Sequence, residues 1–519
     1  MFSGPADSEH PLPHPATLPP TRDPTLNPPI SRSTQDDAAR HGLAYAVWPA
    51  DLATPVRAFL ALRAAGHHAC LLESVEGPAR LARYSFVGVD PVARFRGRQG
   101  ASVLATASGE RKLDGPVHAA LRTAAGHPGL PPPRGLPPFL GGWIGWFAYE
   151  WSSSLEPRVP RAAQDPWRVP DATFDLYEDV VAFDHAAQRL YFVTRCADGT
   201  TLEAAQAKLA ALAEDALEPD SHAPVQSGDL RLRGAFEACT EPAEYERGVA
   251  RLRTAISHGE IFQGVLSQRF EQRFEGDPFT LYRVLRLANP SPHMFFFEAD
   301  GLTLVGSSPE RLVSVQSGRA ENRPIAGTRP RSEDPSADER LARELRGDPK
   351  ERAEHDMLVD LARNDLGRVA RVGSVKVLEH AVLERFARVQ HLVSRVECDL
   401  ASGRDALDAL AASFPAGTVS GAPKVRAMEL LAGIERDTRG PYAGAFGYLD
   451  RAGNLDTALV LRSFVARDGV LSVQAGAGIV WDSDPARERE ETLHKARALF
   501  EAAGQADSDA FRGDGRKPR

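Results

Sequence analysis

The succession of strand-like segments constrains the fold of this chain most. Apolar runs such as Tyr84 to Val89 and Met294 to Glu298 follow one another without a helix-length segment after each one. A parallel, doubly wound sheet needs a crossover helix between successive strands, so this order favours antiparallel sheets. Helical patterns do occur, for example over Pro349 to Leu366. The expected fold class is therefore α+β.

Proline and small polar residues mark the expected boundaries between regions. The first 43 residues are rich in proline and poor in large apolar residues, so they cannot bury enough surface to offset the entropy of ordering. A proline-rich ligand for a partner domain is the alternative. The sequence PDSHAPVQSG separates a first half that contains strand-like runs from a second half that mixes helical and strand-like patterns. The expected organisation is a disordered tail over 1–43, a region over 44–218, a linker over 219–228, a region over 229–505 and a disordered tail over 506–519.

Composition excludes several classes of function. With a net charge of -8, the chain lacks the clustered positive field that nucleic-acid binding requires. Its 4 cysteines, Cys70, Cys196, Cys239 and Cys398, form no CxxC pair, which indicates neither a disulfide framework nor a zinc site. The apolar runs are far shorter than the roughly 20 residues of a membrane-spanning helix. These features predict a soluble protein of the reducing cytoplasm.

Two glycine-containing stretches fail as nucleotide-binding motifs. AGAGIVW (475–481) lacks the third glycine of a dinucleotide fingerprint, and GTVSGAPK (417–424) has the wrong spacing for a P-loop. Both expose backbone, which suits the approach of a small anion or belongs simply to a tight turn. Pro423 stands where a helix running to about Leu431 would begin, and the free amides of its first turn would favour negative charge.

Two titratable residues interrupt apolar segments. Arg462 falls within Ala458 to Ala466, which the pattern predicts to be a buried strand, and a buried guanidinium is costly without an anionic partner. That partner is either a structural carboxylate such as Asp456 or the carboxylate of a bound ligand, and the sequence leaves both open. His391 is either an ordinary core histidine or a group that transfers protons near neutral pH.

Two glutamates are candidates for a metal site. Glu354 and Glu491 fall on two predicted helices, the second of which begins at Asp484 as its N-cap. Lys350 and Lys495 each stand four residues away, so ordinary surface ion pairs explain both glutamates. Alternatively, two carboxylates that meet in space hold Mg²⁺, which takes few protein oxygens and keeps other positions for water or an anionic substrate.

Taken together, a series of ordered motifs identifies a family. The chain resembles the chorismate-utilising enzymes, and within them the large subunit of anthranilate synthase, from about residue 44 to residue 502. The matching motifs are LLES (71–74), ARYSF (82–86), GEIFQ (259–263), NPSP (289–292), GSSPE (306–310), RPIAGTRPR (323–331), ERAEHDMLVDLARNDLGR (351–368), FPAGTVSGAPK (414–424) and QAGAGIVWDSDP (474–485).

This resemblance implies a fold and a set of residue roles. The fold is two antiparallel β-sheets packed face to face with helices outside, a four-layer α/β/β/α arrangement to which both chain halves contribute. Glu354 and Glu491 match magnesium ligands, and Glu310, His391 and Thr418 match the polar and proton-transferring residues beside the substrate ring. The residues implied to contact chorismate are Gly327, Thr328, Tyr442, Arg462, Gly476, Ala477 and Gly478. The region 229–505 would then be catalytic and 44–218 regulatory.

Residue 326 distinguishes the reactions within the family. Synthases of aminodeoxychorismate, isochorismate or salicylate usually carry lysine there, as a nucleophile or a base, whereas this chain has Ala326. A methyl group can do neither, which favours direct attack by ammonia, release of pyruvate and formation of anthranilate by a carbon–oxygen lyase. An aminodeoxychorismate-forming subunit and a non-catalytic regulator that binds chorismate or tryptophan are the alternatives.

The resemblance also implies regulation and a partner. The residues that match the family's tryptophan pocket, which would mediate feedback inhibition of tryptophan biosynthesis, are Leu72, Glu73, Ser74, Pro292, His293 and Met294. Family members usually have tyrosine at the position of His293, so the affinity for tryptophan is open. No cysteine lies in a GxCxGxQ turn, the nucleophile motif of glutamine hydrolysis. Glutamine-dependent activity would therefore require a separate glutamine amidotransferase small subunit, in a hetero-oligomer.

Overall fold

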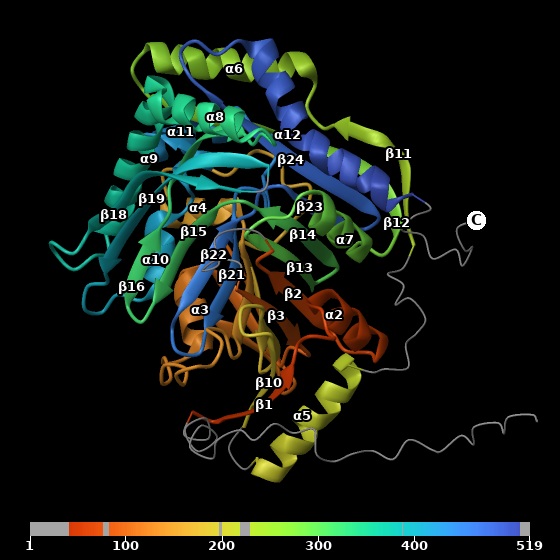
Figure 1. The fold of residues 1–519 in the computed structure, drawn as a ribbon. Helices are drawn as coiled ribbons and strands as arrows, with labels where there is room; N and C mark the ends of the chain where they lie inside the picture. Colours follow the sequence, from red (N-terminus) through yellow and green to blue (C-terminus); the bar gives the residue numbers. More distant parts are fainter. Residues whose placement is uncertain (1–40, 76–82, 197–199, 218–228, 387, 509–519) are drawn as a thin grey trace, which may run out of the picture.

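Two large antiparallel sheets form the centre of the computed structural model, which describes residues 41–75, 83–196, 200–217, 229–386 and 388–508 (Figure 1). Most of the two expected tails and the expected linker, 219–228, lie outside these residues. The first sheet runs in the order β1 (Leu43–Pro49), β10 (Arg189–Arg195), β9 (Asp179–Asp184), β3 (Tyr84–Val89), β2 (Ala69–Glu73), β13 (His293–Ala299), β14 (Leu302–Ser308), β23 (Ser463–Arg467), β24 (Val470–Ile479), β12 (Gln263–Gly276) and β11 (Leu230–Ala238), with β20 (Gly421–Ala422) beside β12.

The second sheet has the same number of strands as the first, and it also combines strands from both halves of the chain. Its order is β17 (Ile325–Pro330), β19 (Val389–Asp399), β16 (Arg319–Asn322), β15 (Arg311–Gln316), β22 (Leu455–Leu459), β21 (Ala445–Asp450), β7 (Gly142–Phe147), β8 (Ala172–Tyr177), β4 (Ala93–Arg98), β5 (Ala101–Thr106) and β6 (Gly109–Leu113), with β18 (Lys376–Arg385) beside β19.

Both chain halves contribute strands to both sheets. In the first sheet β2 pairs with β13, so that Leu72 lies opposite Phe295, and in the second sheet β7 pairs with β21, so that Phe147 lies opposite Ala445. The strand pairings within the two sheets are antiparallel, as expected from strands that follow one another without crossover helices. The α+β prediction and the shared sheets are confirmed.

Helices cover the outer faces of the two sheets and complete the four layers (Figure 1). The first sheet packs against α2 (Pro55–Ala64), α5 (Leu202–Leu217), α7 (Phe279–Ala288) and α12 (Pro485–Ala506), while α6 (Pro242–Ser257) and α11 (Lys424–Ala432) pack near β12. The second sheet packs against α3 (Val117–Ala125), α4 (Ser152–Leu155), α8 (Pro335–Gly347), α9 (Pro349–Gly367) and α10 (Ala406–Ser413). None of the helices in the described ranges has the length and apolar character needed to span a bilayer.

Aromatic side chains fill the space between the sheets. Phe295 of β13 stacks on Phe446 of β21 with ring centroids 4.2 Å apart, and Trp146 and Ile144 of β7 are buried in the same cluster. Burial of large aromatic rings is the principal favourable term for a layer of this kind. The two sheets are therefore joined by a core made from both halves of the chain.

One predicted strand is wrong. The apolar segment Ala458 to Ala466 is divided between β22, which ends at Leu459, and β23, which begins at Ser463. Arg462 lies in the bend between them with φ = 47° and is exposed. Because the chain passes from one sheet to the other here, apolar content alone did not reveal the break.

Candidate functional site

A cavity of about 730 Å³ lies where α9 and α12 approach the ends of β12 and β24. Its volume falls in the range of pockets for small molecules. Its lining combines cations with carboxylates. The lining residues are Phe262, Gln263, Val265, Lys350, Ala353, Glu354, Met357, Thr418, Gly476, Gly478, Val480, Asp482, Ser483, Asp484, Arg487, Glu488, Glu491 and Lys495.

The two predicted metal ligands face this cavity from different helices. The N-caps fix where the helices start: Asp348 accepts hydrogen bonds from the first turn of α9, and Asp484 accepts one from Arg487 N of α12 at 3.0 Å. Burial raises the pKa of Glu354, and the negative charges of Glu351 and Glu491 raise it further. The structure thus brings together two carboxylates that are 137 positions apart in the chain, 354 and 491.

Lys495 lies between one of these carboxylates and the sheet. Its ammonium group pairs with Glu491 at 2.7 Å and donates a hydrogen bond to the carbonyl oxygen of Gly476 at 2.9 Å. The ion pair with Lys495 that the sequence spacing suggested for Glu491 is therefore present. That ion pair is about half exposed on both sides, with exposed fractions of 52% and 48%, so it is weak and exchangeable.

The donor chemistry of the cavity fits a magnesium ion. No group of three or more His, Cys, Asp or Glu residues within the described ranges forms a preformed metal cage. Glu354 and Glu491 offer carboxylate oxygens to the same space, and the mutual repulsion that raises the pKa of Glu354 would be relieved by a divalent cation.

Glu310 lies beside the cavity as a buried carboxyl group. Thr418, which lines the cavity, donates a hydrogen bond from Oγ1 to Glu310 Oε1 at 2.8 Å. Burial raises the pKa of Glu310 to about 7, against the opposing effects of the Thr418 hydrogen bond and the positive charge of Arg462. The group is therefore divided between its acid and carboxylate forms near neutral pH.

Asp456, one of the two partners left open for Arg462, pairs with another arginine. Asp456 is engaged by Arg311, whose Nε and Nη2 donate to its two carboxylate oxygens at 2.9 Å each. Arg462 is exposed, and its positive charge lowers the pKa of Glu310. The guanidinium was expected to need an anion because it would be buried, but the bend after β22 places it at the surface instead.

Glycines on β24 permit close approach to the cavity wall. A Cβ atom on Gly476 would lie 2.9 Å from Tyr442 Oη, and one on Gly478 would lie 2.5 Å from Gln263 Nε2. Successive residues of a strand point to opposite faces, and Ala477 is fully buried in a core cluster with Ile479. Of the three predicted contact residues on this strand, Ala477 can therefore reach a ligand through its backbone alone.

His391 belongs to a separate cluster on β17 and β19. Its Nδ1 lies 2.9 Å from the carbonyl oxygen of Gly327 and 3.1 Å from Oγ1 of Thr328. A carbonyl oxygen accepts only, so Nδ1 carries the hydrogen, and the lone pair of the neutral ring is on Nε2. Gly327 has φ = 69°, and a Cβ there would lie 3.0 Å from the carboxylate of Glu351 on α9. This cluster lies near the start of α9 and is not part of the lining of the 730 Å³ cavity.

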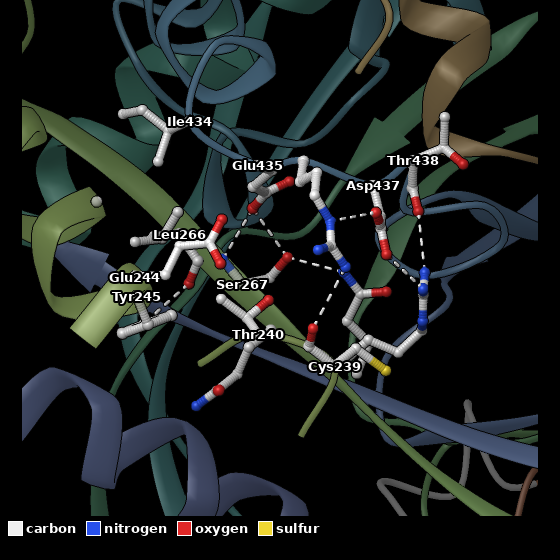
Figure 2. Close-up of a pocket in the computed structure, with 15 residues that line it drawn as sticks. Cys239, Thr240, Glu244, Tyr245, Leu266, Ser267, Ile434, Glu435, Asp437 and Thr438 are labelled. Carbon is white, nitrogen blue, oxygen red and sulfur yellow. Dashed lines mark hydrogen bonds and ion pairs between the residues drawn. The ribbon is translucent and has the colours of Figure 1, made fainter. Parts of the chain in front are cut away.

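A much smaller polar cavity, of about 40 Å³, is lined by residues that include Leu266, Ser267 and Glu435 (Figure 2). Glu435 accepts hydrogen bonds there from the backbone and hydroxyl of Ser267, both at 2.9 Å, and from Arg439 at 2.7 Å. Arg439 in turn lies over the rings of Tyr149 and Tyr442. A space of this size suits water rather than a substrate, so the network supports Tyr442 from behind.

Another cavity, of about 640 Å³, lies between the two sheets. Its lining includes all the residues predicted for an effector pocket: Leu72, Glu73, Ser74, Pro292, His293 and Met294. Burial and the positive charge of Arg311 lower the pKa of His293 to about 4, so its ring is neutral at physiological pH. Ser74 Oγ is buried and has no hydrogen-bond partner among the described residues.

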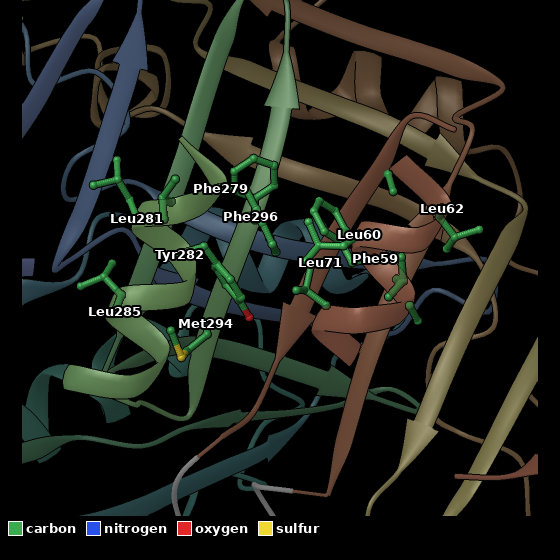
Figure 3. Packing of buried hydrophobic residues seen from close by; sticks show 14 of the residues in the cluster. Phe59, Leu60, Leu62, Leu71, Phe279, Leu281, Tyr282, Leu285, Met294 and Phe296 are labelled. Atoms are coloured by element: carbon green, nitrogen blue, oxygen red, sulfur yellow. The ribbon is translucent and has the colours of Figure 1, made fainter. Parts of the chain in front are cut away.

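The side chain of Glu73 is held from outside this cavity. Tyr282 Oη and Arg286 Nε, both on α7, donate hydrogen bonds to its carboxylate at 2.5 and 2.8 Å. Figure 3 shows Tyr282 beside Met294 in the core between α7 and the first sheet. Glu73 thus anchors the edge of the cavity to α7, which its position in the LLES motif did not reveal.

The sequence analysis missed several residues that line the larger cavity. Gln263, Lys350, Glu488 and Lys495 face it with polar or charged groups. Gln263 is the last residue of the GEIFQ motif, which was a usable signal. Lys350 and Lys495 were considered as surface partners of the two glutamates only, because helical spacing does not show which face is buried.

Comparison with known proteins agrees with this arrangement. The sequence model of the chorismate binding enzyme family matches residues 67–501. The chain belongs to this family. Among members of the family, it is 43% identical over 483 residues to anthranilate synthase component 1 of Synechocystis sp., covering 88% of this chain and 95% of that protein. It is 45% identical to anthranilate synthase component 1 of Thermus thermophilus, covering 88% and 97%.

Solved structures of chorismate binding enzymes share the fold. Anthranilate synthase component I from Streptococcus pneumoniae superposes with a TM-score of 0.72 at 35% identity, covering 81% of this chain and 92% of that chain. The menaquinone-specific isochorismate synthase of Escherichia coli has a TM-score of 0.65 at 19% identity, covering 91% and 99%, which supports the fold alone. The four-layer prediction is confirmed by both.

Proposed function

We propose that this chorismate binding enzyme is an anthranilate synthase large subunit, a magnesium-dependent lyase that converts chorismate and ammonia to anthranilate, pyruvate and water. The observation that carries the proposal is the near full-length similarity, at 43–45% identity, to proteins named anthranilate synthase component 1. Ala326 adds to it, because this buried methyl group can serve neither as the nucleophile nor as the base of the lysine-bearing synthases.

The metal would be held by Glu354 and Glu491, which face one cavity from α9 and α12. When bound, the magnesium ion would neutralise the ring carboxylate of chorismate and stabilise charge that develops there. The ammonium group of Lys495, which pairs with Glu491, would then keep its hydrogen bond to Gly476 O and support that part of β24.

Proton transfer to the leaving group is assigned to Glu310. Ammonia forms a carbon–nitrogen bond to the ring while the allylic carbon–oxygen bond breaks, and the departing hydroxyl takes the proton of Glu310 and leaves as water. A pKa of about 7 keeps a useful fraction of this carboxyl group protonated at neutral pH. Thr418, which donates to Glu310, orients the acid and stabilises the carboxylate that remains after proton transfer.

The second half of the reaction makes the ring aromatic. A ring proton is removed, the carbon–oxygen bond to the enolpyruvyl group breaks, and the released fragment takes up a proton to become pyruvate. His391 is the proposed base, since Nδ1 is held by Gly327 O and the lone pair is on Nε2. Tyr442 and Arg462 are proposed to hold the enolpyruvyl carboxylate, and Gly476 and Gly478 leave room for the ligand beside β24.

Partner, regulation and location follow from the same assignment. We propose that a separate glutamine amidotransferase subunit supplies ammonia, that tryptophan inhibits through the 640 Å³ cavity, and that the enzyme is cytoplasmic. The effector pocket would not be confined to the proposed regulatory region, 44–218, because the cavity is lined by Leu72 to Ser74 and also by Pro292 to Met294.

Product identity tests the proposal directly. The purified chain, supplied with chorismate, MgCl₂ and ammonium salt, is expected to produce fluorescent anthranilate and an equal amount of pyruvate, measured with lactate dehydrogenase. Formation of an aminated product without pyruvate would assign the chain to aminodeoxychorismate synthesis instead. An Ala326→Lys variant is the informative companion, because it should slow anthranilate formation by placing a long cation beside the site.

A further inference from the structure

Arg439 is a buried arginine whose hydrogen bonds reach three separate segments of the chain. Its side chain is 1% exposed. Nε and Nη2 donate to the two carboxylate oxygens of Glu435, both at 2.7 Å. Nη1 donates to the carbonyl oxygen of Val419 and Nη2 to that of Val265, again at 2.7 Å each. One planar guanidinium group therefore joins the segment that follows α11, the segment that precedes β20, and β12.

The segments that Arg439 joins form walls of the 730 Å³ cavity. Val419 directly follows Thr418, which lines the cavity, and Val265 lines it from β12. Tyr442 stands three positions after Arg439, and its ring centroid is 5.9 Å from the guanidinium carbon. The hydroxyl group of Tyr442 reaches the glycine-containing wall at β24. A shift of this guanidinium group would therefore displace several walls of the cavity together.

The first half of the chain fixes the backbone of the same loop. The two carboxylate oxygens of Glu150 accept hydrogen bonds from Arg439 N at 2.7 Å and from Gly440 N at 3.0 Å. Tyr149 N donates to the carbonyl oxygen of Gly440 at 2.9 Å, and the ring of Tyr149 lies 4.3 Å from the guanidinium carbon. Both the backbone and the side chain of Arg439 are therefore held in one arrangement.

Stability alone does not explain an arginine at this position. The cost of removing two charges from water offsets most of their attraction, so well-packed apolar residues are often as stable as a buried ion pair. Arg269 offers a contrast nearby, because it is also buried, at 8% exposed, but its ion pairs are with Glu271 and Asp437, which do not line the cavity. The hydrogen bonds of Arg439 instead end on the backbone of the cavity walls.

We propose that Arg439 is a positioning residue of the chorismate site, which sets the distance between the Thr418 segment, β12 and Tyr442. This inference rests on the proposed function, because it takes Thr418 and Tyr442 to act on chorismate. A displacement of about 1 Å in such a site can cost roughly 100-fold in rate. Lysine cannot replace the arginine, because a single ammonium nitrogen does not reproduce the planar fork that reaches two carbonyl oxygens and a carboxylate.

The experiment compares the natural full chain with Arg439→Lys and Arg269→Lys. We measure kcat and KM for chorismate at saturating MgCl₂ and ammonium, the free energy of unfolding in urea, and the Kd of chorismate by titration calorimetry without ammonium. Arg439→Lys is expected to lower kcat/KM by about 100-fold and to weaken chorismate binding by about tenfold. Arg269→Lys, the matched control, should lose stability and keep kcat/KM and Kd close to the natural values.

Double variants distinguish positioning from a general loss of structure. If Arg439 acts through Tyr442 and Thr418, the loss in kcat/KM of Arg439→Lys combined with Tyr442→Phe or with Thr418→Val should be smaller than the product of the single losses. Losses that multiply in full in both pairs would overturn the proposal, as would a natural kcat/KM in Arg439→Lys.

Two further outcomes are covered by the same measurements. If Arg439→Lys does not fold, Arg439→Gln/Glu435→Gln removes both charges together, and near-natural kcat/KM in that folded variant would refute the role of Arg439. If the natural protein binds chorismate but forms no anthranilate, the proposed function fails, and the Kd values still decide: weaker binding by Arg439→Lys supports positioning, whereas equal binding contradicts it. If the natural protein does not bind chorismate, both proposals fail.

Discussion

The buried acid Glu310 gives a prediction about both stability and activity. Burial raises its pKa from 4.5 to about 7, which corresponds to about 3 kcal/mol at roughly 1.4 kcal/mol per pH unit. The folded-state pKa lies above the unfolded-state value, so the folded protein is favoured while the group is protonated. This contribution is fully present below pH 4.5 and is lost as the pH rises through about 7.

Glu310→Gln replaces the acid with a neutral group of similar shape. The variant should lose nearly all activity because the amide cannot supply the proton. It should be more stable than the natural protein above pH 7, by up to about 3 kcal/mol, and nearly equal to it below pH 4.5. Urea unfolding at pH 4.5, 6 and 8 measures the difference. Equal stability of the two proteins at pH 8 would refute the raised pKa.

The pH dependence of turnover gives an independent measurement of the same group. At constant free ammonia, kcat/KM should fall as the pH rises above about 7, because the acid form of Glu310 is lost. Thr418→Val removes the hydrogen bond that stabilises the carboxylate, and it should move this fall to higher pH by about one to two units. Thr328→Val is the matched control, since Thr328 bonds to His391 and not to Glu310. A fall at the same pH in the natural enzyme and in Thr418→Val would refute the coupling.

Three further predictions test other parts of the structure. Glu354→Gln and Glu491→Gln should each raise the magnesium concentration needed for half-maximal rate by at least about tenfold. Glu490→Gln, which changes an exposed neighbour on α12, should leave that concentration unchanged. A magnesium titration of the rate of each variant measures the difference. Lys424→Met should destabilise the fold by about 3–5 kcal/mol in urea unfolding, because it leaves the buried carboxylate of Asp365 without the ammonium group now 2.8 Å away. The purified chain should be inactive with glutamine alone and active with ammonium, and sustained anthranilate formation from glutamine would contradict the need for a second subunit.

Local sequence signals determined the helices that carry the two glutamates. Asp484, followed by proline, starts α12 as predicted, and α9 begins at Pro349 as predicted, with Asp348 as its N-cap. An N-cap side chain and proline in the first turn act within a few residues, so the local sequence shows them. The helix predicted after Pro423 is likewise confirmed as α11. The motifs also led to the family and its fold, although composition and periodicity alone gave only an antiparallel α+β protein.

The tertiary structure alone decided which side chains meet and in what environment. Arg462 was expected to be buried, and its exposure follows from a bend between strands of two different sheets, which no local pattern encodes. Glu310 is buried beside Thr418, which is more than a hundred positions away in the chain and donates a hydrogen bond to its carboxylate. Sequence spacing fixes local geometry, whereas burial and electrostatic environment depend on segments that only the packed sheets bring together.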